Sequence, residues 1–234
     1  MASSTARTRW SIAGLVLLFV LVLGFVWHSA QRGMLGLSGD TSAIERLTGP
    51  QFSLAALFAH MVTGAVVTLL SVVQLAAPIR QRWPRVHRVS GRVLAGLAFI
   101  TGVGGLIYIA LSGTVGGLPM SIAFGLYGTL MIIAAIQTPR FAMARDYARH
   151  RRWGLRLIVL GLGSWLYRLH YGLWYGTTCS LSDSLCGIAA EPDFSGLFDQ
   201  INLFAFYLPY ILVLEWWLRR EQRVQGDHTP YASS

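Results

Sequence analysis

The chain has 234 residues, of which 54% are hydrophobic and only 12% are charged. Soluble globular domains carry about 25% charged residues, so the composition excludes an ordinary soluble domain. The net charge of +9 includes 19 arginines and no lysine. Because these arginines are spread between apolar runs, they indicate contact with anionic lipid headgroups and not with nucleic acid.

Six apolar runs approach or exceed the length of about 20 residues that a helix needs to cross a bilayer. In chain order they are 10–28, 52–79, 93–111, 119–138, 153–175 and 200–218. The first run is long for a secretory signal and has no small-residue cleavage site directly after it, so we interpret it as a retained span. The sequence predicts an all-α, polytopic membrane helix bundle with six transmembrane helices, forming a single integral membrane domain over residues 1–234.

The arginines also predict the orientation of this bundle. If the N-terminus is cytoplasmic and the spans alternate, 16 of the 19 arginines lie on the cytoplasmic side. Arg32 and Arg46 then lie outside, and Arg168 lies within the fifth span. The positive-inside rule therefore predicts cytoplasmic N- and C-termini in a bacterial inner membrane, with anionic headgroups beside the basic loops.

The segments outside the runs have simpler interpretations. Residues 112–119 predict a tight external turn, and residues 29–51 are long enough for a small external cap. Cys179 and Cys186 both fall in the external loop after the fifth run, where an oxidising compartment favours a disulfide. The composition of residues 221–234 is typical of a disordered cytoplasmic tail.

An internal repeat relates the two central pairs of spans. The stretches HRVSGRVL at 87–94 and HRRWGLRL at 150–157 share His-Arg, Gly and Leu at the same spacing, 63 residues apart. The same shift superposes two further identical pairs, Gln74 on Gln137 and Tyr108 on Tyr171. The repeat units are about 52–111 and 119–175. Both hairpins enter from the same side, which predicts a parallel repeat related by an axis along the membrane normal.

The repeated motif has a structural and a chemical interpretation. An arginine at the membrane boundary can extend to lipid phosphates, and a glycine one turn later lets a neighbouring helix approach closely. In the chemical interpretation, neutral imidazole is an axial ligand for iron, and an arginine such as Arg88 is a partner for haem propionates. The motif alone leaves both interpretations open.

Two further histidines, His60 and His170, lie inside the second and fifth runs. An ionisable residue within a span is costly and marks a functional candidate by default. With His87 and His150 they form an outer and an inner pair, a pattern typical of bis-histidine ligation of b-type haem. No CxxCH motif is present, which excludes covalent c-type attachment. We hypothesise that His60 and His170 bind haem iron and that His87 and His150 form a second pair; the alternative is that each histidine bonds to a neighbouring helix.

Charged and aromatic residues near the outer pair extend this hypothesis. Arg168 points about 200° away from His170, at 100° per residue, so the two residues cannot share one narrow face of the helix. Arg168 could reach a haem propionate, an anionic substrate or a headgroup, and Asp199 is another possible partner. The many aromatic residues of the last two spans are typical of an interfacial belt, and some could line a haem or a quinone. On the sixth run, Glu215 has the i,i+4 spacing for an ion pair with Arg219.

Several stretches of the chain form a combination found in a known family. They are HMVTG within a span, a glutamine near the end of that span, RQRWPRVHRVSGR leading into the next span, and the later HRRWGLRL. Over about residues 52–175 this combination resembles the bacterial membrane-protein family called domain of unknown function 2306, whose members often have His-Arg-Trp-Met at the second histidine motif. The resemblance implies the same topology and importance for His60, His87, Arg88, Gly91 and His150. It does not extend to His170, and the family name carries no activity. A looser likeness in architecture is to four-helix b-type cytochromes of the ascorbate- or ferric-reducing kind.

Two classes of function follow from these residues. The first is an oxidoreductase-type membrane haem protein that transfers electrons from a cytoplasmic or quinol donor to a periplasmic acceptor. The second is a non-redox membrane protein, such as an assembly factor, a small-molecule transporter or a subunit of a larger complex, with structural histidines. Carboxylates are scarce within the spans, which argues against a proton-coupled transporter that relies on buried acids.

Overall fold

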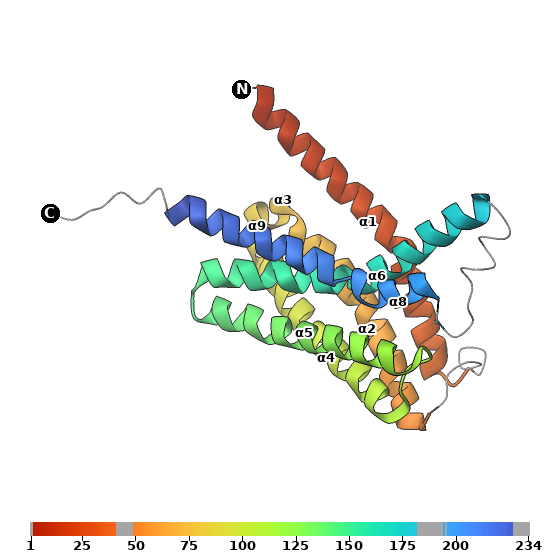
Figure 1. Ribbon diagram of the computed structural model, residues 1–234. Coiled ribbons are helices and arrows are strands. Elements are labelled where there is room, and N and C mark those ends of the chain that lie inside the picture. Colours follow the sequence, from red (N-terminus) through yellow and green to blue (C-terminus); the bar gives the residue numbers. More distant parts are fainter. Residues whose placement is uncertain (1, 41–48, 182–193, 195, 227–234) are drawn as a thin grey trace.

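The computed structural model describes the backbone of residues 2–40, 49–181, 194 and 196–226, and the side chains of residues 12–223 within these ranges. The described residues are helical over most of their length and include no strand, so the all-α prediction is confirmed. The helices are α1 (Ala2–Leu37), α2 (Gln51–Leu75), α3 (Ala77–Arg82), α4 (Pro84–Ser112), α5 (Gly117–Met143), α6 (Tyr147–Leu181), α8 (Leu197–Ala205) and α9 (Leu208–Gly226) (Figure 1).

Five helical segments are long and apolar enough to cross a membrane, which confirms a polytopic membrane bundle. They are Ile12–Leu37, Gln51–Leu75, Pro84–Ser112, Gly117–Met143 and Leu197–Arg223. The predicted fifth span, 153–175, lies in α6, whose 35 residues are more than long enough. Arg156, Arg168 and several tyrosines lower the mean hydropathy of α6, so its crossing of the membrane stays a prediction, as does the cytoplasmic position of the termini.

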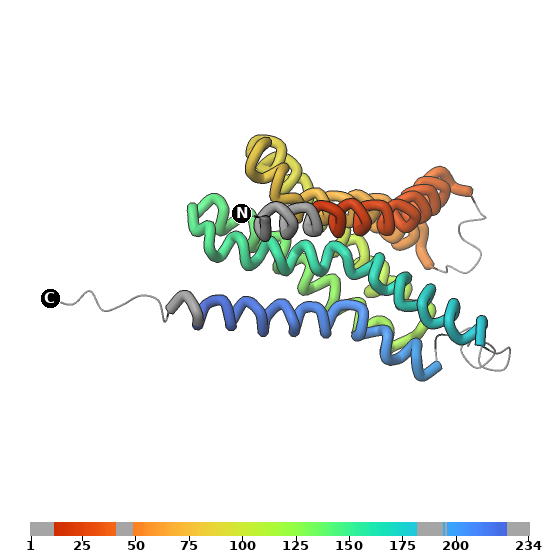
Figure 2. The backbone as a smooth tube through the Cα atoms, turned by 90° about the horizontal axis from the view of Figure 1, so that it is seen from above, coloured from red at the N-terminus to blue at the C-terminus, as the bar shows by residue number. Residues whose placement is uncertain are grey.

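Four helices form the centre of the bundle, and they come from the two predicted hairpins. Helix α2 packs against both α4 and α6, and α5 also packs against both α4 and α6. Helices α4 and α6 therefore lie diagonally across the four-helix arrangement. Helix α1 covers the outside of α2, and Figure 2 places α9 and α3 on opposite sides of the bundle.

Glycines at the contacts let the helices approach closely. A Cβ atom added to Gly33 of α1 would lie 2.7 Å from Val62 of α2, and one added to Gly102 of α4 would lie 2.7 Å from Ile132 of α5. A Cβ at Gly163 of α6 would lie 2.8 Å from the ring of Tyr127. Small residues are typical of helix contacts in membranes because packing replaces the hydrophobic driving force there.

Aromatic residues occupy the core where α5 and α6 meet the break between α8 and α9. Tyr127, Phe206 and Tyr207 are buried, and the rings of Tyr127 and Phe206 meet edge to face with centroids 4.9 Å apart. The hydroxyl of Tyr127 donates to the carbonyl oxygen of Leu160 at 2.5 Å, and that of Tyr207 donates to the carbonyl oxygen of Ala123 at 3.3 Å. Buried phenols need such partners, so these hydrogen bonds fix α6 and the break between α8 and α9 against α5.

The structure refines several boundaries that the sequence left approximate. Helix α1 continues to Leu37, so residues 29–37 of the expected external cap are helical. The last predicted span is broken between α8 and α9, directly before Pro209, which cannot donate a helical hydrogen bond. Helix α9 continues to Gly226, and the rest of the predicted tail lies outside the described residues. Cys186 also lies outside them, so its pairing with Cys179 stays a prediction.

Candidate functional site

One polar side chain from each helix of the central bundle lies at the end where α2 and α5 finish and α4 and α6 begin. These residues are Gln74 of α2, His87 of α4, Gln137 of α5 and His150 of α6. They are two of the pairs that the 63-residue repeat superposes. We call these four residues the inner cluster, and the part of the bundle that holds them the arginine-rich end.

In the first hairpin, Gln74 connects the end of α2 to the start of α4. Its amide nitrogen donates to the carbonyl oxygen of His87 at 3.2 Å and to the hydroxyl of Ser90 at 2.7 Å. A Cβ atom at Gly91 would lie 3.3 Å from the Gln74 amide oxygen. The glycine of the repeated motif therefore leaves room for this buried amide, which supports the structural interpretation of that position.

In the second hairpin, the histidine itself makes the connection. Nδ1 of His150 lies 2.9 Å from the carbonyl oxygen of Thr138 near the end of α5. Because a carbonyl oxygen can only accept, Nδ1 carries the proton and Nε2 carries the lone pair. Metal-binding histidines are commonly held in this way, with one ring nitrogen donating to a backbone oxygen and the other free for the metal.

His87 does not repeat the contact of His150, because the two hairpins differ locally. The residue that corresponds to Thr138 is Leu75, where α2 ends, and the chain then turns into an extended conformation at Ala76. Nδ1 of His87 is buried and has no hydrogen-bond partner among the described residues, and the same is true of the amide oxygen of Gln137. His87 and His150 are close enough to interact electrostatically. The inner cluster thus places two imidazoles at one end of the bundle and leaves two buried polar atoms without a partner among the described residues.

Farther along the bundle from the inner cluster, His60 connects α2 to α4. Its Nδ1 lies 2.7 Å from the carbonyl oxygen of Thr101, so Nδ1 donates and Nε2 carries the lone pair. A Cβ atom at Gly105 would lie 3.1 Å from this Nδ1. The hydroxyl of Thr101 donates to the hydroxyl of Thr63 at 2.8 Å beside it. His60 therefore lies at a close helix contact that depends on glycine.

His170 belongs to a different contact, between α6 and the α8–α9 segment. Its Nδ1 lies 2.7 Å from the side-chain oxygen of Asn202, and its Nε2 lies 2.8 Å from the hydroxyl of Tyr210. Asn202 is buried and also donates to the carbonyl oxygen of Tyr167 at 3.3 Å. Both ring nitrogens of His170 are therefore engaged. No hydrogen bond or ring contact among the described residues joins His170 to His60.

A buried carboxylate lies next to this contact. Asp199 is 1% exposed, and its Oδ1 accepts a hydrogen bond from the Tyr171 hydroxyl at 2.5 Å. Its Oδ2 is buried and has no hydrogen-bond partner among the described residues. Asp199 makes no ion pair with Arg168, one of the partners considered from the sequence. That arginine instead donates to the carbonyl oxygen of Ser164 at 3.2 Å and lies over the ring of Phe25, 4.9 Å from its centroid.

Two other arginine predictions have different outcomes. Arg88 is exposed, and its Nε donates to the carbonyl oxygen of Pro84 on its own helix at 3.3 Å. The predicted pair of Glu215 with Arg219 is wrong, because Glu215 instead forms two hydrogen bonds with Arg156 on the neighbouring α6, at 2.5 and 3.0 Å. The two parallel N–H donors of the Arg156 guanidinium match the two carboxylate oxygens of Glu215, which makes this a strong, charge-assisted pair.

The described residues contain no group of three or more His, Cys, Asp or Glu side chains placed to hold a metal ion. The sequence did not indicate Thr101 or Thr138 as partners, because their backbone oxygens leave no sequence signal. Asn202, in contrast, has a sequence signal, because it is a polar residue inside an apolar run.

Comparison with known proteins gives one relationship. Neither a curated protein nor a solved structure matches the chain. A family model described as a predicted membrane protein, DUF2306, matches residues 57–190, which is more than half of the chain and includes all four histidines at the two sites. The match confirms the resemblance drawn from the histidine motifs, and the chain belongs to the DUF2306 family of integral membrane proteins.

Proposed function

We propose that this membrane protein binds a b-type haem between His87 and His150 and takes part in electron transfer. One observation carries the proposal: corresponding histidines of the two hairpins lie at the same end of the bundle, within electrostatic range of each other, and one of them has a buried ring nitrogen without a partner among the described residues. A haem with two histidine ligands supplies reversible one-electron transfer at a potential set by its ligands and surroundings.

The position of the two histidines supports this assignment. Helices α4 and α6 are diagonal neighbours, since each packs against α2 and α5. A flat group held between His87 and His150 would lie along the middle of the bundle, between α2 and α5. Helix bundles commonly build cofactor sites in this way, from side chains that face one another across the core.

The hydrogen bonds of the histidine ring nitrogens also support a haem between His87 and His150. His150 is held by Thr138 in the tautomer that leaves Nε2 free to bind a metal. In His87, neither ring nitrogen hydrogen-bonds to a described residue. If Nε2 of His87 binds iron, its Nδ1 needs an acceptor, and the unsatisfied amide oxygen of Gln137 lies on the adjoining α5 at the same end of the bundle.

Charge at this end suits a dianionic porphyrin. Arg80 lies near enough to His87 to interact with it electrostatically, and Arg88 and Arg151 follow the two histidines directly in sequence. Arg88 is exposed and makes no ion pair among the described residues, whereas Arg151 is bonded to Glu221 at 2.6 Å. Arg80 and Arg88 are therefore the better placed partners for propionate groups.

The outer pair fits a haem less well. His60 has a free Nε2, but His170 would have to give up its hydrogen bond to Tyr210 to bind iron. The rings of these two histidines are held by different neighbours, Thr101 of α4 and the α8–α9 segment. The proposal therefore assigns the haem to the inner pair.

The test is the visible absorption spectrum of the full chain, expressed with ample haem supply, purified in detergent as a monodisperse fraction and recorded before and after dithionite reduction. We expect a Soret band that shifts on reduction, together with sharp alpha and beta bands. His87→Ala and His150→Ala should each abolish these bands. His28→Ala, at an exposed position on α1, should leave them unchanged.

Other results would contradict the proposal in distinct ways. If His60→Ala and His170→Ala lose the bands while the inner variants keep them, the haem lies at the outer pair. A featureless spectrum of the unmodified chain would exclude haem at both pairs. The non-redox alternative would then remain, with the unsatisfied atoms of His87 and Gln137 in contact with a polar solute or another subunit.

A further inference from the structure

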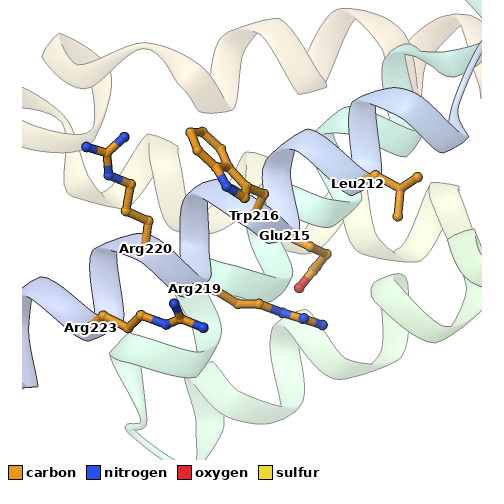
Figure 3. Close-up of a pocket in the computed structure, with 6 residues that line it drawn as sticks. All are labelled: Leu212, Glu215, Trp216, Arg219, Arg220 and Arg223. Carbon is orange, nitrogen blue, oxygen red and sulfur yellow. The ribbon is translucent and has the colours of Figure 1, made fainter.

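The arginine-rich end of the bundle has a groove between α6 and α9 that the haem proposal does not use. Two adjoining hollows form this groove, of about 550 Å³ along α9 and about 330 Å³ between α9 and α6. Glu215 and Arg219 line both hollows. Figure 3 shows the hollow along α9, with the arginines following the acid and the tryptophan down the helix. The arginines that line the groove are Arg149, Arg152, Arg156, Arg219, Arg220 and Arg223.

The groove retains positive charge after its ion pairs are counted. Glu215, the acidic residue that lines it, is bonded to Arg156 through both carboxylate oxygens. No ion pair of Arg219, Arg220 or Arg223 is present among the described residues. A ligand with a negative charge would therefore find several guanidinium groups without a bound carboxylate.

The same groove also has an apolar end. Leu212 and Trp216 line it one to two turns before the arginines, and their side chains are 65% and 61% exposed. The guanidinium group of Arg220 lies over the ring of Trp216, 5.7 Å from its centroid. Moving along α9, the lining thus changes from the apolar Leu212, past Glu215 in its ion pair, to the aromatic Trp216 and then to the arginines. Apart from that paired acid, this is the order of acyl chain, interface and phosphate in a phospholipid.

We propose that the α6–α9 groove binds an acidic phospholipid, with its phosphodiester headgroup at Arg219 and Arg223 and its acyl chain along Leu212 and Trp216. Basic pockets between transmembrane helices are typical binding sites for anionic headgroups. Arginine suits this ligand because its planar donors bind two phosphate oxygens at once. A free phosphate would use only the basic end, so the exposed apolar end favours the lipid.

The experiment measures lipid retained by the full chain in native mass spectrometry. The protein is purified in a non-ionic detergent and mixed with equal amounts of phosphatidylglycerol and phosphatidylcholine, with and without inorganic phosphate. The unmodified chain should retain phosphatidylglycerol in preference to phosphatidylcholine, and phosphate should not displace it. The double variant Arg219→Gln/Arg223→Gln should lose about tenfold in phosphatidylglycerol retention.

The matched control is Arg82→Gln/Arg85→Gln, which removes the same charge at exposed positions on α3 and the start of α4, on the side of the bundle away from α9 (Figure 2). This control should retain the lipid as the unmodified chain does. Equal losses in the two double variants would overturn the proposal in favour of a diffuse basic surface. Displacement by inorganic phosphate, or equal retention of the two lipids, would overturn it as well. Circular dichroism on each variant verifies that the helices are intact.

Discussion

Arg156 of α6 and Glu215 of α9 form an ion pair with two hydrogen bonds, Nε to Oε1 at 2.5 Å and Nη2 to Oε2 at 3.0 Å. Their side chains are 22% and 26% exposed. The pair joins the last helix to the central bundle at the arginine-rich end. It also lies beside the ring of Trp153, whose centroid is 4.5 Å from the Arg156 guanidinium.

Removing the charge of this pair should destabilise the protein. Glu215→Gln keeps the shape of the side chain but leaves a mostly buried guanidinium without its counter-charge, so we expect a loss of about 1–3 kcal/mol in the free energy of unfolding. The measurement is reversible unfolding in mixed micelles followed by circular dichroism. Glu221→Gln is the matched control, because the pair of Glu221 with Arg151 is more exposed and should contribute less than about 1 kcal/mol. Equal losses would show that the burial of the Glu215 pair adds nothing.

A methyl group at Gly105 should disturb the position of His60. The added Cβ would lie 3.1 Å from Nδ1 of His60, which is tighter than ordinary contact, so α2 and α4 must separate or the bond to Thr101 must weaken. We expect Gly105→Ala to lower the free energy of unfolding by about 1–3 kcal/mol. Gly96→Ala on the same helix meets no atom within 4 Å. It should be neutral or stabilising, by up to about 1 kcal/mol, because alanine favours the helix. Thermal melting of the two variants in parallel checks this difference, and equal melting temperatures would contradict it.

Local signals in the sequence were sufficient to predict most of the helices. Long apolar runs predict spans because backbone groups in lipid must bond within their own helix, and five such segments are present. The residues that begin and end a helix also act locally: α4 begins at Pro84, and it ends at Gly113, which has a positive φ of 71°. The turn predicted at 112–119 was therefore confirmed between α4 and α5.

The partners of the site residues could not be predicted in the same way, because they depend on which helices become neighbours. His60 and His150 donate to backbone oxygens of Thr101 and Thr138, and any residue type could supply such an oxygen. Glu215 had a suitable partner, Arg219, on its own helix, yet its carboxylate bonds to Arg156 on the adjacent helix. Periodicity describes one helix at a time and holds no information on these pairings.

The contact between His170 and Asn202 should behave as a coupled pair. His170→Leu leaves the Asn202 oxygen without its donor, and Asn202→Leu leaves Nδ1 of His170 without its acceptor, so each variant should lose stability. The double variant replaces both polar groups, and we expect it to lose less than the sum of the two, with a coupling energy of about 0.5–3 kcal/mol. A double-mutant cycle on unfolding free energies checks this prediction. Strict additivity would mean that the two side chains do not interact in the membrane.

The same cycle bears on the haem test. If His170 is structural, its variants lose stability whether or not haem is present, and the loss of a spectrum in His170→Ala could result from unfolding. Stability and absorbance therefore have to be recorded on the same preparation. A variant that loses the Soret band but keeps its helices, and melts at the same temperature as the unmodified chain prepared without haem, identifies a ligand.

Asp199→Asn should stabilise the protein or leave its stability unchanged, although it alters a fully buried residue. The amide oxygen can still accept the hydrogen bond from Tyr171, whereas the carboxylate oxygen that now lacks a partner among the described residues becomes an uncharged amide nitrogen. Burying an unpaired charge costs more than burying a neutral polar group, so we expect a gain of up to about 2 kcal/mol. Asp199→Ala, which removes the acceptor as well, should lose about 1–3 kcal/mol because the Tyr171 hydroxyl is left unsatisfied. Melting temperatures of the two variants separate these effects. If Asp199→Asn is as unstable as Asp199→Ala, the prediction fails, and the carboxyl group itself is required at this position.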